Sequence, residues 1–341
     1  MLTPPKGLRD ALPEEEEKAF FLASRLVPHL VRCGYRLVRT PLLEYLETFS
    51  ASGEPALDER TLKLIEWETG KVMAVRTDFT PPIARLAASL AETRKPPLRF
   101  SYCGPVLKFD LRKSTKKREE LQLGAELIGR GGVEGDREII ELCVSVLRHA
   151  GLKRFVVQVG DVRFLHAVAR GASARSLRKK EWPALHLSGL AAGRGGERPM
   201  LEGSPAVLAR LARSVRDKRA RAALAGLRQS LRAVLRDRKG FQIHVDLGEV
   251  RDLHYYTGLF FQVFHPDTTD PVATGGRYDG LLRKFGRDLP ATGFAVDLSA
   301  LSKLVPSSSR LHGITAPRWR RTRPATPATD GRRKKASAGS R

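Results

Sequence analysis

Apolar residues recur at helical spacing in three stretches of the chain. In residues 13–34 they follow a proline and four glutamates, and the pattern stops at Gly34. Proline in the first turn and acids near the positive end of the helix dipole favour a helix start, and glycine favours its end. Residues 136–150 carry a second apolar face, and Pro81 and Pro82 can begin a third helix. The pattern therefore predicts three amphipathic helices in the first half of the chain.

Short apolar runs between these helices predict strands. The runs 98–111 and 121–128 are separated by a charged loop, which is typical of an antiparallel pair. The full set of expected strands is 35–41, 72–75, 98–111, 121–128, 155–159, 241–247, 259–265, 272–274 and 292–296. Strands outnumber helices in the middle of the chain, so we expect an antiparallel sheet flanked by helices, an α+β fold.

The charge of the chain is concentrated in two regions. The 341 residues carry a formal net charge of +24. Residues 161–240 hold 19 Lys and Arg against 6 Asp and Glu, residues 306–341 hold 10 against 1, and the remainder holds 32 against 30. The first region is helical in pattern, whereas the second has few large apolar side chains to bury. We expect a domain over 1–305 with a basic helical insertion at 161–240, and a disordered basic tail over 306–341.

These basic regions allow two interpretations. They could bind RNA or DNA through phosphate groups. Solvated arginine-rich helices explain the same composition without a nucleic-acid partner, and we favour that explanation. No apolar run approaches the roughly 18 residues of a membrane span, and the N-terminus lacks the apolar segment of a signal peptide. The three cysteines lie far apart without metal-ligand spacing, so we expect reduced thiols, a cytoplasmic protein and no metal or cofactor.

Two segments combine tyrosine, arginine and glycine. They are residues 251–258, Arg-Asp-Leu-His-Tyr-Tyr-Thr-Gly, and residues 273–280, Ala-Thr-Gly-Gly-Arg-Tyr-Asp-Gly. Tyrosine supplies a flat wall with a hydroxyl group, arginine a planar fork for a carboxylate or phosphate, and glycine close backbone approach. Ordinary strands with turn glycines remain the alternative, but together the segments suit a pocket for a small polar ligand.

Gln122 and Glu126 lie four residues apart in an expected strand. Side chains at this spacing point to the same face of a strand. Polar side chains on the inward face need a partner or a ligand, so either a binding site or a buried structural hydrogen bond explains them. Asp78 has a similar double interpretation, because it can bind a ligand ammonium or cap the helix that follows.

Six segments in order resemble the histidyl-tRNA synthetase family. They are residues 5–10 (Pro-Lys-Gly-Leu-Arg-Asp), 34–44, 76–80 (Arg-Thr-Asp-Phe-Thr), 117–129, 251–258 and 273–280. The resemblance implies a class II aminoacyl-tRNA synthetase-like catalytic-domain fold, in which 34–44 lies at a dimer interface. It also implies a histidine pocket made by Asp78, Thr80, Lys108, Gln122, Glu126, Arg251, Tyr255, Tyr256 and Tyr278.

The resemblance also implies a role for several of these residues. Asp78 would hold the α-amino group of histidine, and Glu126 would lie near the imidazole. Arg251 would reach the carboxylate or a phosphate. Tyr256 and Tyr278 would form the walls around the imidazole, with Thr257 and Arg277 beside them.

The chain departs from the synthetases where they bind ATP. Lys108 stands where the second class II motif has arginine, and an ammonium lacks the bidentate fork of a guanidinium. In the third motif Asp297 replaces a glycine and Ala300 replaces an arginine. A carboxylate near a triphosphate is repulsive, and the lost arginine removes transition-state stabilisation. We therefore expect amino-acid activation to be lost, and the residues after 305 are too few for the anticodon-binding domain of the synthetases.

Because it keeps the histidine pocket and lacks the ATP-binding arginines, the chain resembles the regulatory subunits of ATP phosphoribosyltransferase, which are paralogues of the synthetases. This resemblance implies a non-catalytic protein at the first step of histidine biosynthesis. Its partner would be the short-form ATP phosphoribosyltransferase catalytic subunit, with L-histidine as the feedback effector and a homodimer within a hetero-oligomer. The alternatives are a divergent, truncated histidyl-tRNA synthetase and a basic RNA-binding paralogue.

Overall fold

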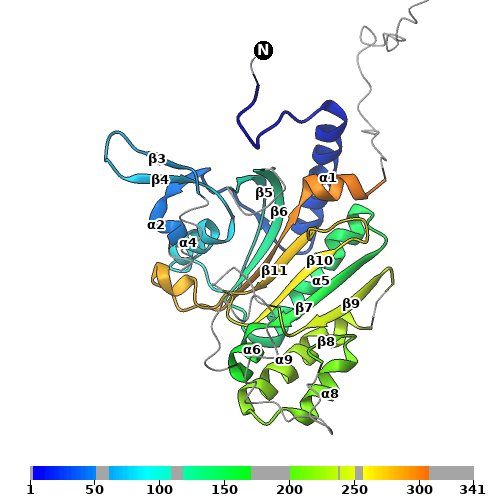
Figure 1. The fold of residues 1–341 in the computed structure, drawn as a ribbon. Helices are drawn as coiled ribbons and strands as arrows, with labels where there is room; N and C mark the ends of the chain where they lie inside the picture. Colours follow the sequence, from blue (N-terminus) through cyan, green and yellow to red (C-terminus); the bar gives the residue numbers. More distant parts are fainter. Residues whose placement is uncertain are drawn as a thin grey trace, which may run out of the picture. The chain divides into compact units, whose positions relative to one another are not determined.

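Nine strands from distant parts of the chain form one sheet (Figure 1). The computed structural model describes residues 3–50, 61–108, 118–169, 200–236, 239–249 and 256–306. The described elements belong to the unit Met1–Ser307, which is distinct from Ser308–Arg341. In spatial order the sheet contains β1 (Arg36–Leu37), β5 (Leu98–Leu107), β6 (Glu119–Ile128), β12 (Ala291–Asp297), β11 (Ala273–Arg277), β10 (Leu259–Phe264), β7 (Phe155–Asp161), β9 (Phe241–Asp246) and β8 (Glu202–Gly203).

Most neighbouring strands in this sheet are antiparallel, as the sequence predicts. Two pairs, β1 with β5 and β7 with β9, are parallel instead. A parallel pair needs a long crossover connection. Helices α6 (Val162–Val168), α8 (Ala206–Ser214) and α9 (Lys218–Val234) lie in the connection from β7 to β9. The sheet is therefore mixed, because the helical insertion returns the chain to the same end of the sheet.

Helices cover one face of the sheet and form the larger core with it (Figure 1). Besides α6, α8 and α9 these are α1 (Pro13–Arg32), α5 (Gly132–Ala150) and α10 (Leu298–Leu304). The α5 positions Ile139, Cys143 and Val146 are buried, as their helical spacing predicts. Helix α5 begins four residues before the expected 136–150 and ends at Gly151, which adopts a φ of 99°. Glycine reaches that left-handed conformation without the steric cost of a Cβ.

The opposite face carries a second, smaller core. There α4 (Thr80–Leu90) and the short 3-10 helix η3 (Leu282–Phe285) pack with residues of β5, including Phe100 and Tyr102. A separate three-stranded sheet, β2 (Leu43–Tyr45), β4 (Val72–Val75) and β3 (Lys63–Ile65), accompanies α2 (Leu46–Ser50) and α4. Strand β4 has its predicted bounds, whereas β2, β3 and α2 were not predicted, because three to five residues carry little periodicity.

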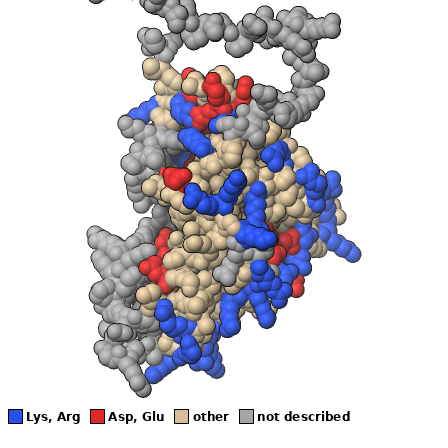
Figure 2. All heavy atoms as spheres, turned by 90° about the vertical axis from the view of Figure 1, so that its right-hand side faces the viewer, with Lys and Arg blue, Asp and Glu red and all other residues tan. Residues whose placement is uncertain are grey.

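The described part of residues 161–240 is mainly helical, in line with the predicted basic insertion. Lys and Arg side chains prevail over Asp and Glu on the face of the molecule that Figure 2 draws. Its residues 170–199 lie outside the described part, as do residues 307–341 of the predicted tail, so both domain boundaries stay predictions. The expected strand 35–41 is shorter, because only Arg36 and Leu37 pair within the sheet. Among the described helices, none is both long and apolar enough to cross a membrane.

Candidate functional site

A buried carboxylate, Glu126, lies between hydroxyl groups from two other elements. Glu126 belongs to β6 and is 1% exposed. The hydroxyl of Thr80, the first residue of α4, donates to its Oε1 at 2.8 Å, and the hydroxyl of Tyr278, just after β11, donates to its Oε2. Burial raises the pKa of Glu126 to about 8, although the two hydroxyl donors oppose this shift. Nearby Asp78 raises the pKa further. A carboxylate that ionises near neutral pH is typical of a functional position.

Gln122 faces the same side of β6 as Glu126. It is 4% exposed, and its Oε1 has no hydrogen-bond partner in the part of the chain that the structure describes. A buried acceptor without a donor costs free energy, so a ligand that donates a hydrogen bond would stabilise it. Between the two polar residues, Gly124 has no side chain and Tyr102 fills the space, because a Cβ at Gly124 would collide with the Tyr102 phenol.

Two further glycines let side chains lie across the strands. Gly293 of β12 pairs with Glu126, and a Cβ there would collide with the carboxylate. A Cβ at Gly276 of β11 would lie 2.6 Å from the ring of Tyr256. Glycine is therefore required at both positions because the polar and aromatic groups of the site rest directly on the backbone.

Asp78 lies at both of the places that its two expected roles require. Its Oδ1 accepts a long hydrogen bond of 3.4 Å from the backbone N–H of Thr80 at the start of α4. Its charge also acts on Glu126 and Tyr278, since it contributes to raising the pKa of both groups. The carboxylate therefore lies at the site as well as at the helix start.

Lys108 lies within range of three acidic side chains, those of Glu120, Asp78 and Asp297. Lys108 Nζ forms an ion pair with Glu120 at 2.7 Å. Burial lowers the pKa of Lys108, but the negative charges of Glu120, Asp78 and Asp297 outweigh burial, so the pKa is raised overall. Asp297 Oδ1 accepts hydrogen bonds from the N–H groups of Ser299 at 2.9 Å and Ala300 at 3.1 Å. Asp297 thus caps α10, and its carboxylate stabilises a helix start.

The two tyrosine-rich segments are only partly described. Arg251 and Tyr255 lie outside the described residues. Tyr256 is half-buried, with its ring 6.3 Å from that of Phe260, and Tyr278 is buried against Glu126. Of the four pocket residues predicted from these segments, the structure places Tyr256 and Tyr278 on the sheet face that carries Glu126.

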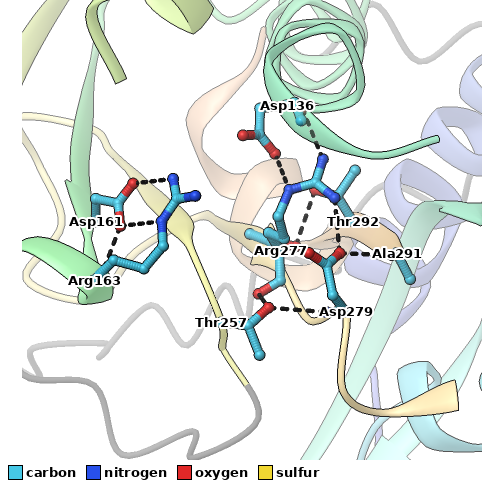
Figure 3. A network of polar contacts seen from close by, with 10 residues as sticks. Asp136, Asp161, Arg163, Thr257, Arg277, Asp279, Ala291 and Thr292 are labelled. Carbon is cyan, nitrogen blue, oxygen red and sulfur yellow. Dashed lines mark hydrogen bonds and ion pairs between the residues drawn. The ribbon is translucent and has the colours of Figure 1, made fainter. Parts of the chain in front are cut away.

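Arg277 does not join Tyr278 at the site, although the sequence interpretation grouped them. Consecutive residues of a strand point to opposite faces, and the guanidinium of Arg277 lies against the start of α5 (Figure 3). It forms ion pairs with Asp136 and Asp279.

Tyr102 lies beside the candidate site, although the sequence interpretation did not include it. It is fully buried beside Phe79 and donates to the carbonyl of Phe294 at 3.3 Å. Its position within an apolar run gave no sign of this.

Comparison with known proteins identifies the family. The family model described as histidyl-tRNA synthetase matches residues 7–301. An ATP phosphoribosyltransferase regulatory subunit from Anaeromyxobacter dehalogenans (strain 2CP-1) is 38% identical over 98% of this chain and 98% of its own length. One from Chromobacterium violaceum is 34% identical over 91% of this chain and 84% of its own length.

Solved structures agree with these sequence matches. A crystal structure named ATP phosphoribosyltransferase regulatory subunit/histidyl-tRNA synthetase, from Bacillus halodurans C, has a TM-score of 0.78 at 30% identity. The match covers 90% of this chain and 84% of that chain. A histidine–tRNA ligase subunit from Alicyclobacillus acidocaldarius has a TM-score of 0.70 at 27% identity, over 89% of this chain and 97% of its own. Because sequence and fold agree over nearly the whole length, the chain belongs to the ATP phosphoribosyltransferase regulatory subunits, a family with the class II histidyl-tRNA synthetase-like fold.

Proposed function

We propose that this chain is the non-catalytic regulatory subunit of a short-form ATP phosphoribosyltransferase, and that it senses L-histidine in the pocket around Glu126. In this role it acts in the cytoplasm at the first step of histidine biosynthesis. It raises the activity of the catalytic subunit and transmits feedback inhibition. The names of its relatives support the regulatory role. The three free thiols support a reducing compartment.

The buried Glu126 is the observation that carries the histidine proposal. Its carboxylate accepts the N–H of an imidazole, and a hydrogen bond to a charged group is stronger than one between neutral groups. The ring of Tyr278 forms a wall beside it. Asp78 and the side-chain carbonyl of Gln122 accept hydrogen bonds from the ligand ammonium. This contact satisfies the Gln122 oxygen, which has no partner among the described residues. In this assignment Arg251 and Tyr255 complete the pocket from the segment outside the described residues.

The surroundings of Lys108 support the loss of amino-acid activation. Its ammonium is paired with Glu120 rather than held for a phosphate. The Asp297 carboxylate caps α10 where a synthetase needs room for a triphosphate, and Ala300 supplies no cation. Removing one preorganised donor from an active site typically costs about two to three decades in rate. We therefore propose that the protein no longer forms an aminoacyl adenylate.

An exposed apolar surface supports the proposed homodimer. The register of the three-stranded sheet places Leu43, Tyr45 and Leu64 on one face. These side chains are 38%, 40% and 43% exposed, although Val75, which pairs with Leu43 on the same face, is buried. Contiguous exposed apolar side chains are typical of protein interfaces. In this proposal the face contacts a second copy of the chain. Light scattering measures the molar mass at micromolar concentration, and the mass of a monomer would contradict the proposal.

A transferase assay tests the proposed function. The short-form catalytic subunit from the same source is assayed with and without this chain while L-histidine is titrated. We expect this chain to raise the activity and histidine to suppress the increase. The variant E126Q should still raise the activity but respond weakly to histidine. If the chain has no effect on transferase activity at any histidine concentration, the regulatory proposal is wrong, and an unchanged histidine response in E126Q would remove Glu126 from the pocket.

A further inference from the structure

Arg277 holds three separate groups with its three guanidinium nitrogens. It is 2% exposed. Its Nε donates to Asp136 Oδ1 at 2.7 Å, one Nη to Asp279 Oδ1 at 2.8 Å and the other Nη to the carbonyl of Gly132 at 3.0 Å (Figure 3). Gly132 and Asp136 belong to the first two turns of α5. These three contacts, the Arg277 clamp, therefore fix the end of β11 to the start of α5.

The backbone of Arg277 connects the two tyrosine-rich segments. Its carbonyl accepts the N–H of Thr257 at 2.8 Å, and the Thr257 hydroxyl accepts the N–H of Asp279 at 2.9 Å. Tyr256, next to Thr257, lies over Gly276, and Tyr278, next to Arg277, donates to Glu126. The backbone of one residue thus connects the two segments that carry the aromatic side chains of the proposed pocket.

The Arg277 clamp is an unfavourable way to stabilise the fold, because it takes charged groups out of water. Burial raises the pKa of Asp136 to about 6, even though the Arg277 guanidinium lowers it. Buried ion pairs often contribute little net stability compared with apolar packing, because both charges lose their hydration. A planar fork does fix direction, however, and the ammonium of lysine cannot reproduce three divergent donors. The clamp is thus better suited to fixing a geometry than to stabilising the fold.

We propose that Arg277 is a positioning residue of the histidine pocket, which holds Tyr278 against Glu126 and Tyr256 over Gly276 from the opposite side of the sheet. The inference rests on the proposed function, since it gives Arg277 a role in the histidine pocket. Arg277 itself does not touch the ligand and acts through the two tyrosines. In this proposal the first turns of α5 hold Arg277 in place, and Arg277 in turn fixes the positions of the two tyrosines.

This role predicts that Arg277 influences the ionisation of Glu126. The titratable groups that act on Glu126 are Tyr278 after β11 and Asp78 before α4, and Tyr102 of β5 lies within electrostatic range. The Tyr278 hydroxyl lowers the pKa of Glu126, whereas burial and Asp78 raise it. Loss of the Tyr278 hydrogen bond should therefore raise the pKa of Glu126 further. Loss of a hydrogen bond to a charged group corresponds to a change of about one to two pKa units.

The test compares R277K with R99K. Arg99 is a matched control, because it also ties a strand to α5 through a two-point contact with Glu138, at 2.7 and 3.1 Å. The Glu126 carboxyl is titrated by carbon-13 NMR in ligand-free protein labelled at glutamate, and the signal is assigned with E126Q. We expect the Glu126 pKa to rise by about one unit or more in R277K and to stay unchanged in R99K. Calorimetry at pH 8 should show about tenfold weaker histidine binding by R277K alone.

An unchanged Glu126 titration in a folded R277K, or an equal shift in R99K, overturns the inference. If R277K does not fold, D279A removes the half-exposed arm of the clamp, together with the hydrogen bond that Asp279 Oδ1 accepts from the N–H of Ala291 at 3.0 Å. The same shift in direction is expected from it. The NMR titration needs no ligand. A wild-type protein that fails to bind histidine would therefore refute the proposed function, while the titration still decides the role of Arg277.

Discussion

Replacing Glu126 with glutamine should stabilise the protein and weaken its binding of histidine. Glutamine keeps the shape of the side chain and removes its charge. The Thr80 and Tyr278 hydroxyls that donate to the carboxylate can rotate to suit the amide. The substitution therefore separates the charge of Glu126 from its packing.

The stability change follows from the raised pKa of Glu126. The folded value is about 8, against an ordinary value of 4.5. Below pH 4.5 the carboxyl is protonated in both states and contributes nothing. Between pH 4.5 and 8 the unfolded chain releases the proton while the folded chain keeps it, so the stability of the wild type falls as pH rises. The difference is roughly 3–5 kcal/mol at pH 8, at about 1.36 kcal/mol per unit. E126Q lacks this loss and should melt about 5 °C higher at pH 8.

The affinity change has the opposite sign. A hydrogen bond between a ligand N–H and a carboxylate contributes about 1.5–3 kcal/mol, so its loss should weaken histidine binding about 10- to 150-fold. Wild-type affinity should rise with pH through about 8, as Glu126 becomes ionised. Binding by E126Q should lack that increase, because glutamine does not titrate.

Calorimetric titration with L-histidine and melting curves from pH 5 to 9 measure both effects. The control is E138Q, at a carboxylate bound by Arg99, Arg130 and Tyr35. Burial opposes ionisation there, but these partners outweigh it and lower the pKa of Glu138. E138Q should therefore destabilise the protein and leave histidine affinity unchanged. If E126Q binds histidine as tightly as the wild type does, Glu126 does not belong to the histidine pocket. If E126Q melts at a lower temperature than the wild type at pH 8, the charge of Glu126 does not destabilise the fold.

Three further predictions concern other positions. G293A should abolish histidine binding in calorimetry and lower the melting temperature, because its Cβ collides with the Glu126 carboxylate; normal binding would contradict this geometry. The stacked rings of His29 and His149 are 4.4 Å apart, and burial lowers both pKa values. The unfolded chain therefore takes up protons first as pH falls below 6.5, so stability should fall there, and H149Q should flatten the melting temperature between pH 7 and 5. A300R should not restore histidine-dependent pyrophosphate exchange, because the carboxylate that caps α10 remains; measurable exchange would show that the missing arginine was the sole defect.

Period-two spacing was enough to predict that two residues of the proposed site share one face of a strand. Gln122 and Glu126 share a face of β6, as their four-residue separation predicts, and both are buried. The prediction succeeds because side-chain direction in a strand depends on local backbone geometry alone. The same geometry shows where the sequence interpretation failed. Arg277 and Tyr278 are neighbours in one segment, so they cannot both face the pocket from a regular strand, and only Tyr278 does.

Other features depend on contacts between distant segments. Tyr102 lies beside Gly124 and Phe294, and nothing in its own segment distinguishes it from a core residue. The raised pKa of Glu126 depends on burial by residues from several elements. The parallel pairing of β7 with β9 depends on how the insertion returns to the sheet.

The sequence by itself determined the class of fold and most of the long helices and strands, because these follow from local periodicity. The residues of the proposed pocket came from the resemblance to the synthetase family. Only the tertiary structure decided which side chains meet. It placed Thr80 and Tyr278 on the Glu126 carboxylate, left the Gln122 oxygen without a partner among the described residues, and turned Arg277 toward α5. The physical reason is that burial, hydrogen-bond partners and pKa depend on neighbours in space, and the chain order does not specify those neighbours.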